Sequence, residues 1–171
     1  MTAPSPAIQR HVFSVLVNDE PGVLARVIGL FSGRGYNIES LTVANVDPEK
    51  ALSRITIVSS GTPQILEQIE AQLNRIVPVR KVVDLTREGP VVEREMALVK
   101  VNGKGDKRME ALKVAEAARA VSRDASPDAF IFEITGAPEQ IDDFINLMRP
   151  LGLVEVVRSG VLGLSRGGKV A

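Results

Sequence analysis

Residues 17–43 of the chain read VNDEPGVLARVIGLFSGRGYNIESLTV, in which apolar residues recur at intervals of three and four. That spacing places them on one face of an amphipathic helix, which we expect to span residues 22–33. Strands are expected on either side of the helix, over residues 11–17 and 37–45. The apolar face consists of Leu24, Val27, Ile28 and Phe31. We therefore predict a helix that packs on a sheet to which both flanking strands belong.

The residues around this helix also suggest a binding site for a small zwitterion. Backbone amides at the start of a helix lack partners and bind anions, including the carboxylate of a free amino acid. Asp19 supplies an acid for an ammonium group, Gly22 allows close approach of a ligand, and Asn37 and Ile38 add an amide and an apolar side chain. The alternative is purely structural, with Pro21 and Gly22 shaping a turn and Asn37 capping a loop.

The rest of the first half completes a βαββαβ order. A turn at residues 47–50 leads into a strand over 52–59, Thr62 and Pro63 begin a second helix, and a fourth strand covers 79–85. The apolar face of the second helix consists of Ile65, Ile69, Leu73 and Ile76. This order predicts a ferredoxin-like domain, in which two helices cover one face of a four-stranded antiparallel sheet.

The second half repeats this architecture with different residues. Strands are expected over residues 96–101 and 153–157, a helix over 106–118, and two strands around a turn at 126–128. A further helix carries an apolar face that consists of Ile141, Phe144, Ile145 and Met148. The predicted fold class is therefore α+β, with two ferredoxin-like domains.

The composition changes around Gly89 and Pro90, which we take as the boundary between the domains. The predicted organisation is a flexible tail over residues 1–9, a first domain over 10–86, a linker over 87–93 and a second domain over 94–171.

Two glycine-containing stretches in the second half have open interpretations. The sequence from Gly103 to Gly105 is too short for a nucleotide-binding loop, so a flexible polar turn is favoured. The apolar stretch from Ser159 to Leu164 is either a final edge strand or a docking surface.

The composition excludes several classes of function. Lys plus Arg equals Asp plus Glu at 21 each, so no basic field attracts nucleic acid or anionic lipid. The chain has no cysteine and one histidine, which excludes a thiolate site and a histidine metal cluster within one chain. We expect that histidine, His11, to be an incidental surface residue. No apolar run reaches the length of a membrane span and no signal segment is recognisable, so a cytoplasmic protein is expected.

Residues 18–24, Asn-Asp-Glu-Pro-Gly-Val-Leu, resemble the opening turn of ACT domains, which bind amino acids and regulate enzymes of amino-acid metabolism. The run from Arg26 to Val43 more specifically resembles the small regulatory subunits of acetohydroxyacid synthase, also called acetolactate synthase. Residues 52–57, 92–100 and 158–167 are similar to further segments of that family, so the likeness spans about residues 10–167.

The resemblance implies a non-catalytic subunit that binds the large catalytic subunit, activates it and transmits feedback inhibition by valine, sometimes with leucine or isoleucine. It also implies an effector between two copies of the domain, with Asp19, Gly22, Val23 and Leu24 of one copy facing Asn37 and Ile38 of the other. Thiamine diphosphate, Mg and FAD are expected in the catalytic partner and no cofactor in this chain. A homodimer also follows from small domain size and an unpaired strand edge over residues 37–45.

Three other classes are less well supported. An ACT-domain regulator of a different amino-acid pathway enzyme would share the opening turn. An acylphosphatase-like enzyme has the same chain order but needs an arginine in a phosphate-binding first loop, and the loop here is acidic. An RNA-binding module of this topology displays aromatic residues on its central strands, whereas this chain has only five Phe and one Tyr.

Overall fold

The computed structural model describes residues 7–171, and the chain divides into two compact units. The first unit runs to Val92 and also takes in Val161–Ala171, and the second consists of Glu93–Gly160. The elements up to residue 90 are β1 (Gln9–Asn18), α1 (Val23–Arg34), β2 (Ser40–Asp47), β3 (Leu52–Gly61), α2 (Pro63–Leu73), β4 (Val79–Asp84) and α3 (Leu85–Glu88). The remaining elements are β5 (Val91–Val101), α4 (Asp106–Ala117), β6 (Val121–Ala125), β7 (Phe130–Gly136), α5 (Pro138–Met148), η1 (Arg149–Leu151), β8 (Leu153–Arg158) and β9 (Leu162–Ser165).

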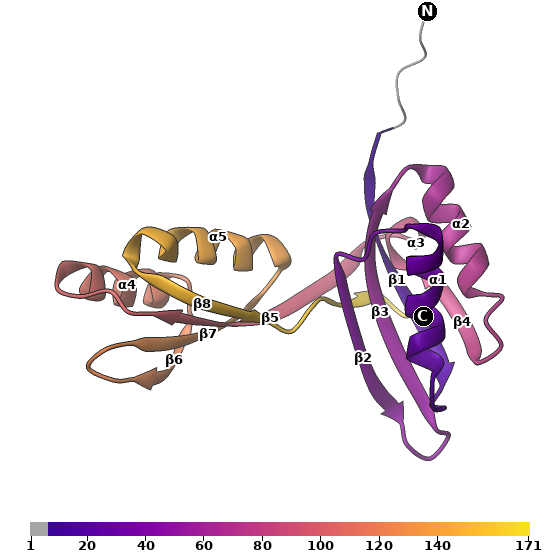
Figure 1. Ribbon diagram of the computed structural model, residues 1–171, viewed down its shortest axis with the longest axis horizontal. Coiled ribbons are helices and arrows are strands. Elements are labelled where there is room, and N and C mark those ends of the chain that lie inside the picture. The colour runs from indigo at the N-terminus through magenta and orange to yellow at the C-terminus, as the bar shows by residue number, and fades with distance from the viewer. Residues whose placement is uncertain (1–6) are drawn as a thin grey trace, which may run out of the picture. The chain divides into compact units, whose positions relative to one another are not determined.

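The first unit contains an antiparallel sheet in the order β2-β3-β1-β4, with α1 and α2 on the same face (Figure 1). β1 is central and buried on both faces, which explains its nearly continuous apolar sequence. Between the sheet and the helices lies a core that includes Phe13, Val15, Val27, Phe31 and Ile57. The βαββαβ order predicted from the sequence is confirmed, and β2 lies at the edge of the sheet.

The end of the chain lies on the face of this first sheet opposite α1 and α2, where the short helix α3 also packs. Val161 joins a second buried cluster that also contains Val12, Val58, Val83 and Leu85. The backbone N–H of Val161 donates to Ser40 Oγ at 2.8 Å, and Arg54 donates to the backbone oxygen of Ala171 at 3.0 Å. We call residues 161–171 the C-terminal strap. The strap gives the first sheet a covering on its second face.

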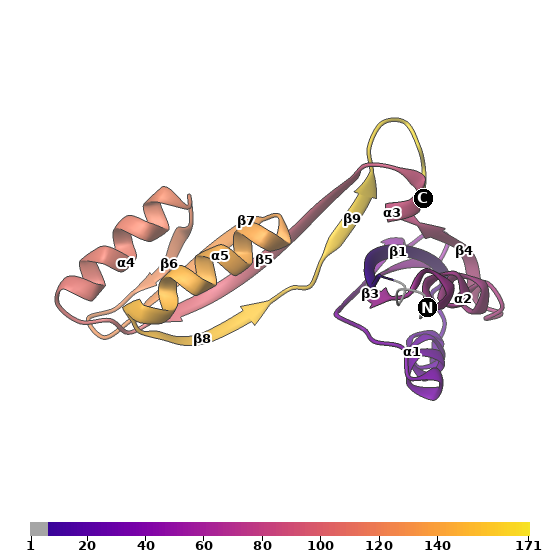
Figure 2. The same cartoon turned by 90° about the horizontal axis from the view of Figure 1, so that it is seen from above.

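The second unit has the corresponding strand order β6-β7-β5-β8, with α4 and α5 on one face (Figure 2). Its core includes Val99, Phe132, Ile141, Phe144 and Met148. β9 also pairs with β5. The predicted α+β class with two ferredoxin-like domains is therefore confirmed.

A close backbone contact explains the first glycine of the turn before α4. A Cβ added at Gly103 would lie 2.2 Å from the carbonyl oxygen of Leu151, and real Cβ atoms do not come so close to a backbone atom. The turn is held as well by the Asn102 amide, which donates to the Gly152 carbonyl at 2.9 Å. Gly103 therefore has a packing role, in agreement with the interpretation of this stretch as a turn.

The structure differs from the predicted boundaries in three places. Residues 161–171 were assigned to the second domain, but they pack with the first unit because Val161 is apolar and the face of the first sheet is open to it. The predicted linker over 87–93 contains the end of α3 and the start of β5. Most of the predicted tail over residues 1–9 lies outside the described residues, and Gln9 already belongs to β1.

Two side-chain predictions were wrong. Ile28 was placed on the sheet-facing side of α1, but it is 39% exposed, and Val23 is buried instead. His11 was expected to be an incidental surface residue, yet its side chain is only 14% exposed. Its Nδ1 lies 2.6 Å from the carboxylate of the buried Asp84, because β1 and β4 are neighbouring strands.

Candidate functional site

The start of α1 provides backbone donors without intramolecular acceptors. Gly22 is the residue before the helix and has φ +84°, a left-handed conformation that favours glycine. No side chain caps the helix, and the Val23 amide bonds to the Glu20 carbonyl at 3.2 Å. Within residues 7–171, the amides of Leu24 and Ala25 have no hydrogen-bond acceptor. These two amides are available to an external anion, as predicted for this end of the helix.

Asp19 is fixed beside this helix start by the hairpin of β2 and β3. Its backbone amide donates to the Ala51 carbonyl at 2.7 Å, and its Oδ2 accepts from Asn45 Nδ2 at 2.9 Å. Its side chain is otherwise exposed. A carboxylate held in this way is oriented before any ligand arrives, and an ammonium group is a suitable partner for it.

Asn37 and Ile38 lie at the opposite end of α1. They were predicted to begin a strand, but β2 begins only at Ser40, so both residues belong to the loop before it. Ser59 Oγ donates to the Asn37 carbonyl at 2.6 Å and fixes the backbone there. The side chain of Asn37 is exposed, with no hydrogen-bond partner in the described part of the chain, while Ile38 packs against the core of the first unit.

One copy of the chain does not bring the six predicted residues into a single pocket. α1 has 12 residues, and a helix of that length extends about 18 Å between its two ends. Asp19, Gly22, Val23 and Leu24 lie at one end of the helix, whereas Asn37 and Ile38 follow its other end. Proximity in sequence is therefore misleading here, and the predicted site requires residues from two copies.

Exposed apolar side chains accompany these residues. Val43 and Val46 on the edge strand β2 are 44% and 50% exposed, and Ile28 on α1 is also exposed. Since no strand in residues 7–171 pairs with the outer side of β2, its backbone groups and these side chains are free to contact another molecule.

Two residues that help to orient the helix start were not identified from the sequence. Asn45 comes from β2, and Arg80 comes from β4, where its Nε donates to Asn18 Oδ1 at 2.6 Å. They lie 26 and 62 residues away from the side chains that they contact. The strand register brings Asn45 and Arg80 close to their partners, and no local sequence motif predicts these contacts.

Neither a metal-binding cluster nor a membrane-spanning helix is present in the described residues. No group of three or more His, Asp or Glu side chains that could hold a metal ion was found in residues 7–171. No helix in the part of the chain that the structure covers is both long and apolar enough to cross a membrane.

Both halves of the chain match known protein families. Residues 13–81 match the AHAS small subunit-like ACT domain, and residues 94–167 match the small subunit of acetolactate synthase. The fold and the helix-start donors thus belong to an ACT-domain protein with a second ferredoxin-like domain.

Individual relatives extend this match over almost the whole chain. The probable acetolactate synthase small subunit of Archaeoglobus fulgidus is 43% identical over 160 residues, which cover 94% of this chain and 99% of the relative. The acetolactate synthase isozyme 3 small subunit of Salmonella typhimurium is 46% identical over 162 residues, or 94% of this chain and 98% of the relative. The crystal structure of the small subunit from Thermotoga maritima superimposes with a TM-score of 0.83 at 38% identity and covers 94% of this chain and 99% of that one. This chain belongs to the acetolactate synthase small-subunit family, as the sequence resemblance indicated.

Proposed function

We propose that this chain is the non-catalytic regulatory subunit of an acetolactate synthase and that it binds and activates a large catalytic subunit. The proposal is supported by relatives named as small subunits, which align with 94% of the chain, and by the ACT-domain match of the first unit. Thiamine diphosphate, Mg and FAD would reside in the catalytic partner.

The proposed effector is valine, with leucine and isoleucine as weaker candidates. The observation that carries this proposal is the pair of amides of Leu24 and Ala25, which have no acceptor in the described residues and suit the carboxylate of an amino acid. The fixed carboxylate of Asp19 suits the ammonium group. From a second copy, Asn37 adds a side-chain amide and Ile38 an apolar contact for the branched side chain.

The proposed site thus depends on a homodimer of the first unit. The two ends of α1 are about 18 Å apart. A single copy therefore cannot contact one valine molecule both with the helix start and with Asn37 and Ile38. Association through the edge strand β2 would cover its unpaired backbone together with Val43 and Val46. A ligand bound across such an interface stabilises the arrangement of chains to which it binds best, which is sufficient for regulation.

Titration calorimetry of valine into the full-length chain tests ligand class and dimer dependence together. We expect saturable binding. Each site should hold one valine between the start of α1 of one copy and Asn37 of the other copy. Sedimentation at the same concentrations should show the dimer. Absence of valine binding to a dimeric chain would contradict the effector assignment, and valine binding to a monomer would contradict the two-copy site.

Activation of the large subunit by this chain is tested in a separate assay. Addition of the chain to an acetolactate synthase large subunit should increase acetolactate production, and valine should then reduce it. A large subunit whose rate does not change in the presence of this chain would refute the regulatory assignment, whatever the result of the calorimetry.

A further inference from the structure

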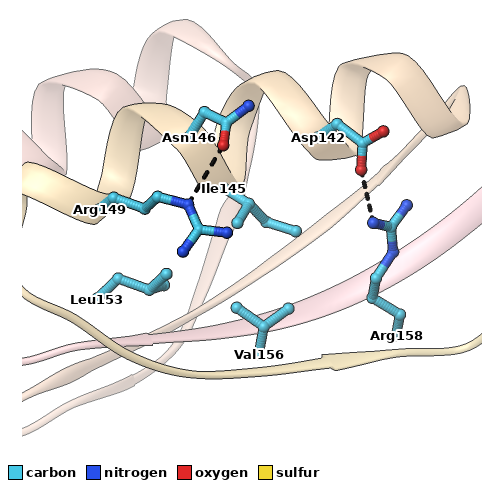
Figure 3. Close-up of a pocket in the computed structure, with 7 residues that line it drawn as sticks. All are labelled: Asp142, Ile145, Asn146, Arg149, Leu153, Val156 and Arg158. Atoms are coloured by element: carbon cyan, nitrogen blue, oxygen red, sulfur yellow. Dashed lines mark hydrogen bonds and ion pairs between the residues drawn. The ribbon is translucent and has the colours of Figure 1, made fainter.

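A groove in the second unit contains charged and apolar side chains in an arrangement unrelated to the α1 site. It has a volume of about 660 Å³ and lies between α5 and the edge strand β8 (Figure 3). It is lined by Asp142, Ile145, Asn146, Arg149, Leu153, Val156 and Arg158. All of these residues come from one unit, so the groove is complete within a single copy.

Arg158 forms one end of the groove, and each of its three nitrogens donates to a carboxylate. Its Nε and Nη2 donate to the two carboxylate oxygens of Glu95 at 2.8 and 2.7 Å, and its Nη1 donates to Asp142 at 2.6 Å. Glu95 is only 4% exposed, so this ion pair is anchored in the interior. The hydrogen bonds that Arg158 donates to Glu95 and Asp142 raise its pKa. The guanidinium of Arg158 is therefore fixed in place, and each of its three nitrogens already has a carboxylate partner.

Arg149 forms the other end and has free donors. Its Nε donates to Asn146 Oδ1 at 3.3 Å, which orients the guanidinium. Neither Nη1 nor Nη2 has a partner in residues 7–171. Figure 3 shows the guanidinium between Asn146 and Leu153, with one terminal nitrogen directed toward Ile145 and the other toward Leu153. Two parallel N–H donors in this geometry match the two oxygens of a carboxylate.

The space between the two arginines is apolar. Ile145 on α5 is 7% exposed, and Leu153 and Val156 on β8 are half-buried and pack against the core of the second unit. Figure 3 shows Ile145 above and Val156 below this space. A short branched hydrocarbon chain would find contact on both sides there.

We propose that this groove binds a small aliphatic monocarboxylate, with the carboxylate on Arg149 and the hydrocarbon chain between Ile145 and Val156. Among the residues that line the groove, Arg149 has two terminal nitrogens without partners in residues 7–171, whereas those of Arg158 already bind carboxylates, which favours a single carboxylate over a dicarboxylate.

An α-amino acid is a poorer ligand for this groove. Its ammonium group lies next to its carboxylate and would be held beside the positive charge of Arg149. The acid in the groove, Asp142, is seven positions earlier on the helix, about 10 Å away along its axis, so it does not reach that ammonium group. The groove is thus distinct in ligand class from the valine site proposed at α1.

Methyl chemical-shift titration of the full chain with isovalerate tests the proposal. We expect saturable shifts for Ile145, Leu153 and Val156, with a dissociation constant of about 1 mM, as is typical for so small a ligand. Isovaleramide has the same shape without the charge and should bind at least about tenfold more weakly. Valine should also bind the groove more weakly than isovalerate.

Arg149→Gln should weaken isovalerate binding about tenfold or more, because it removes the charge and one of the paired donors. Arg119→Gln is the matched control, since Arg119 is an exposed arginine of the same unit without a side-chain partner in the described residues. Melting curves of both variants should match the parent, because Arg149 is exposed.

Three results would overturn the assignment. They are no saturable shift up to ~50 mM isovalerate, equal binding by the Arg149 and Arg119 variants, and equal binding of isovalerate and isovaleramide. Tighter binding of valine than isovalerate in the groove would overturn the ligand class. Gly22→Asp should leave isovalerate binding unchanged, so failure of the α1 site and failure of this groove are distinguishable.

Discussion

Gly22→Asp is the substitution that most directly tests the proposed effector site. A Cβ added at Gly22 has nothing within 4 Å, so the new side chain fits without displacing neighbours. The φ angle of +84° makes any L-residue unfavourable there, at a cost of about 1–2 kcal/mol, and aspartate tolerates the left-handed region better than most residues. We therefore expect a folded protein with slightly reduced stability.

The substitution should weaken valine binding by at least as much as it destabilises the fold. Gly22 precedes α1, so an aspartate carboxylate there lies beside the amides of Leu24 and Ala25 and competes for them as a helix cap. It also repels the carboxylate of valine. Two unit charges about 4 Å apart interact by about 1 kcal/mol in water and about 4 kcal/mol near a protein surface. Valine affinity should accordingly fall by between about fivefold and a thousandfold.

The assay is acetolactate production by the large subunit reconstituted with each variant, measured with and without valine. Gly22→Asp should still activate the large subunit but should need far more valine for inhibition. Gly22→Asn is the control for shape, because it tolerates the same φ without adding charge. Valine sensitivity in the Asp variant equal to that of the parent would refute the assignment of the helix start; melting curves check that the variant is folded at the assay temperature.

The remaining predictions concern stability and ionisation. Glu95→Gln should destabilise the protein by about 1–3 kcal/mol in urea unfolding, less than a fully buried pair would lose, because Arg158 is partly exposed and keeps Asp142. Leu85→Ala should cost about 2–5 kcal/mol, since Leu85 is fully buried beneath the C-terminal strap. Arg123→Ala should return the pKa of Glu133 toward its ordinary range, because hydrogen bonding to Arg123 lowers it, and carboxyl NMR titration measures the change. Because the pKa of Glu133 is lower in the folded protein than in the unfolded chain, the pair stabilises the fold while Glu133 is ionised. This stabilisation is lost as the pH falls through the pKa of Glu133 in the folded protein.

Each of these predictions has an outcome that would contradict it. Leu162→Ala removes a leucine that is 60% exposed and should change stability by less than about 0.5 kcal/mol, so an equal loss in both leucine variants would contradict the burial argument. An unchanged unfolding free energy for Glu95→Gln would show that the Arg158 pair contributes nothing. A Glu133 pKa that stays low in Arg123→Ala would mean that another group lowers it.

The order of the main helices and strands could be predicted from the sequence. So could the end of α1 at which backbone amides are left without acceptors. It was less successful with side-chain direction, since Val23 and not Ile28 completes the buried face of α1. Apolar spacing identifies a helical face only to within about one position, because the exposed Ile28 is as apolar as the residues that point inward. Asn45 could not be identified as a partner of Asp19, because their contact depends on the register of a hairpin.

The C-terminal strap was missed for a different reason. Val161 comes three positions after the end of β8, and nothing in the local sequence distinguishes a further strand of the second domain from a return to the first. Its partners, Ser40 and Val12, lie more than a hundred positions earlier in the chain. A contact of such long range leaves no periodic pattern.

The strap has a consequence for the synthesis of the protein. Translation proceeds from the N-terminus, and residues up to Val92 emerge from the ribosome long before Val161 is added. Until then Val12, Val83 and Leu85 lack the side chain that covers them. The first unit therefore acquires its complete native packing only after the whole second unit has been made, and a nascent chain that stalls between them presents an apolar sheet to chaperones.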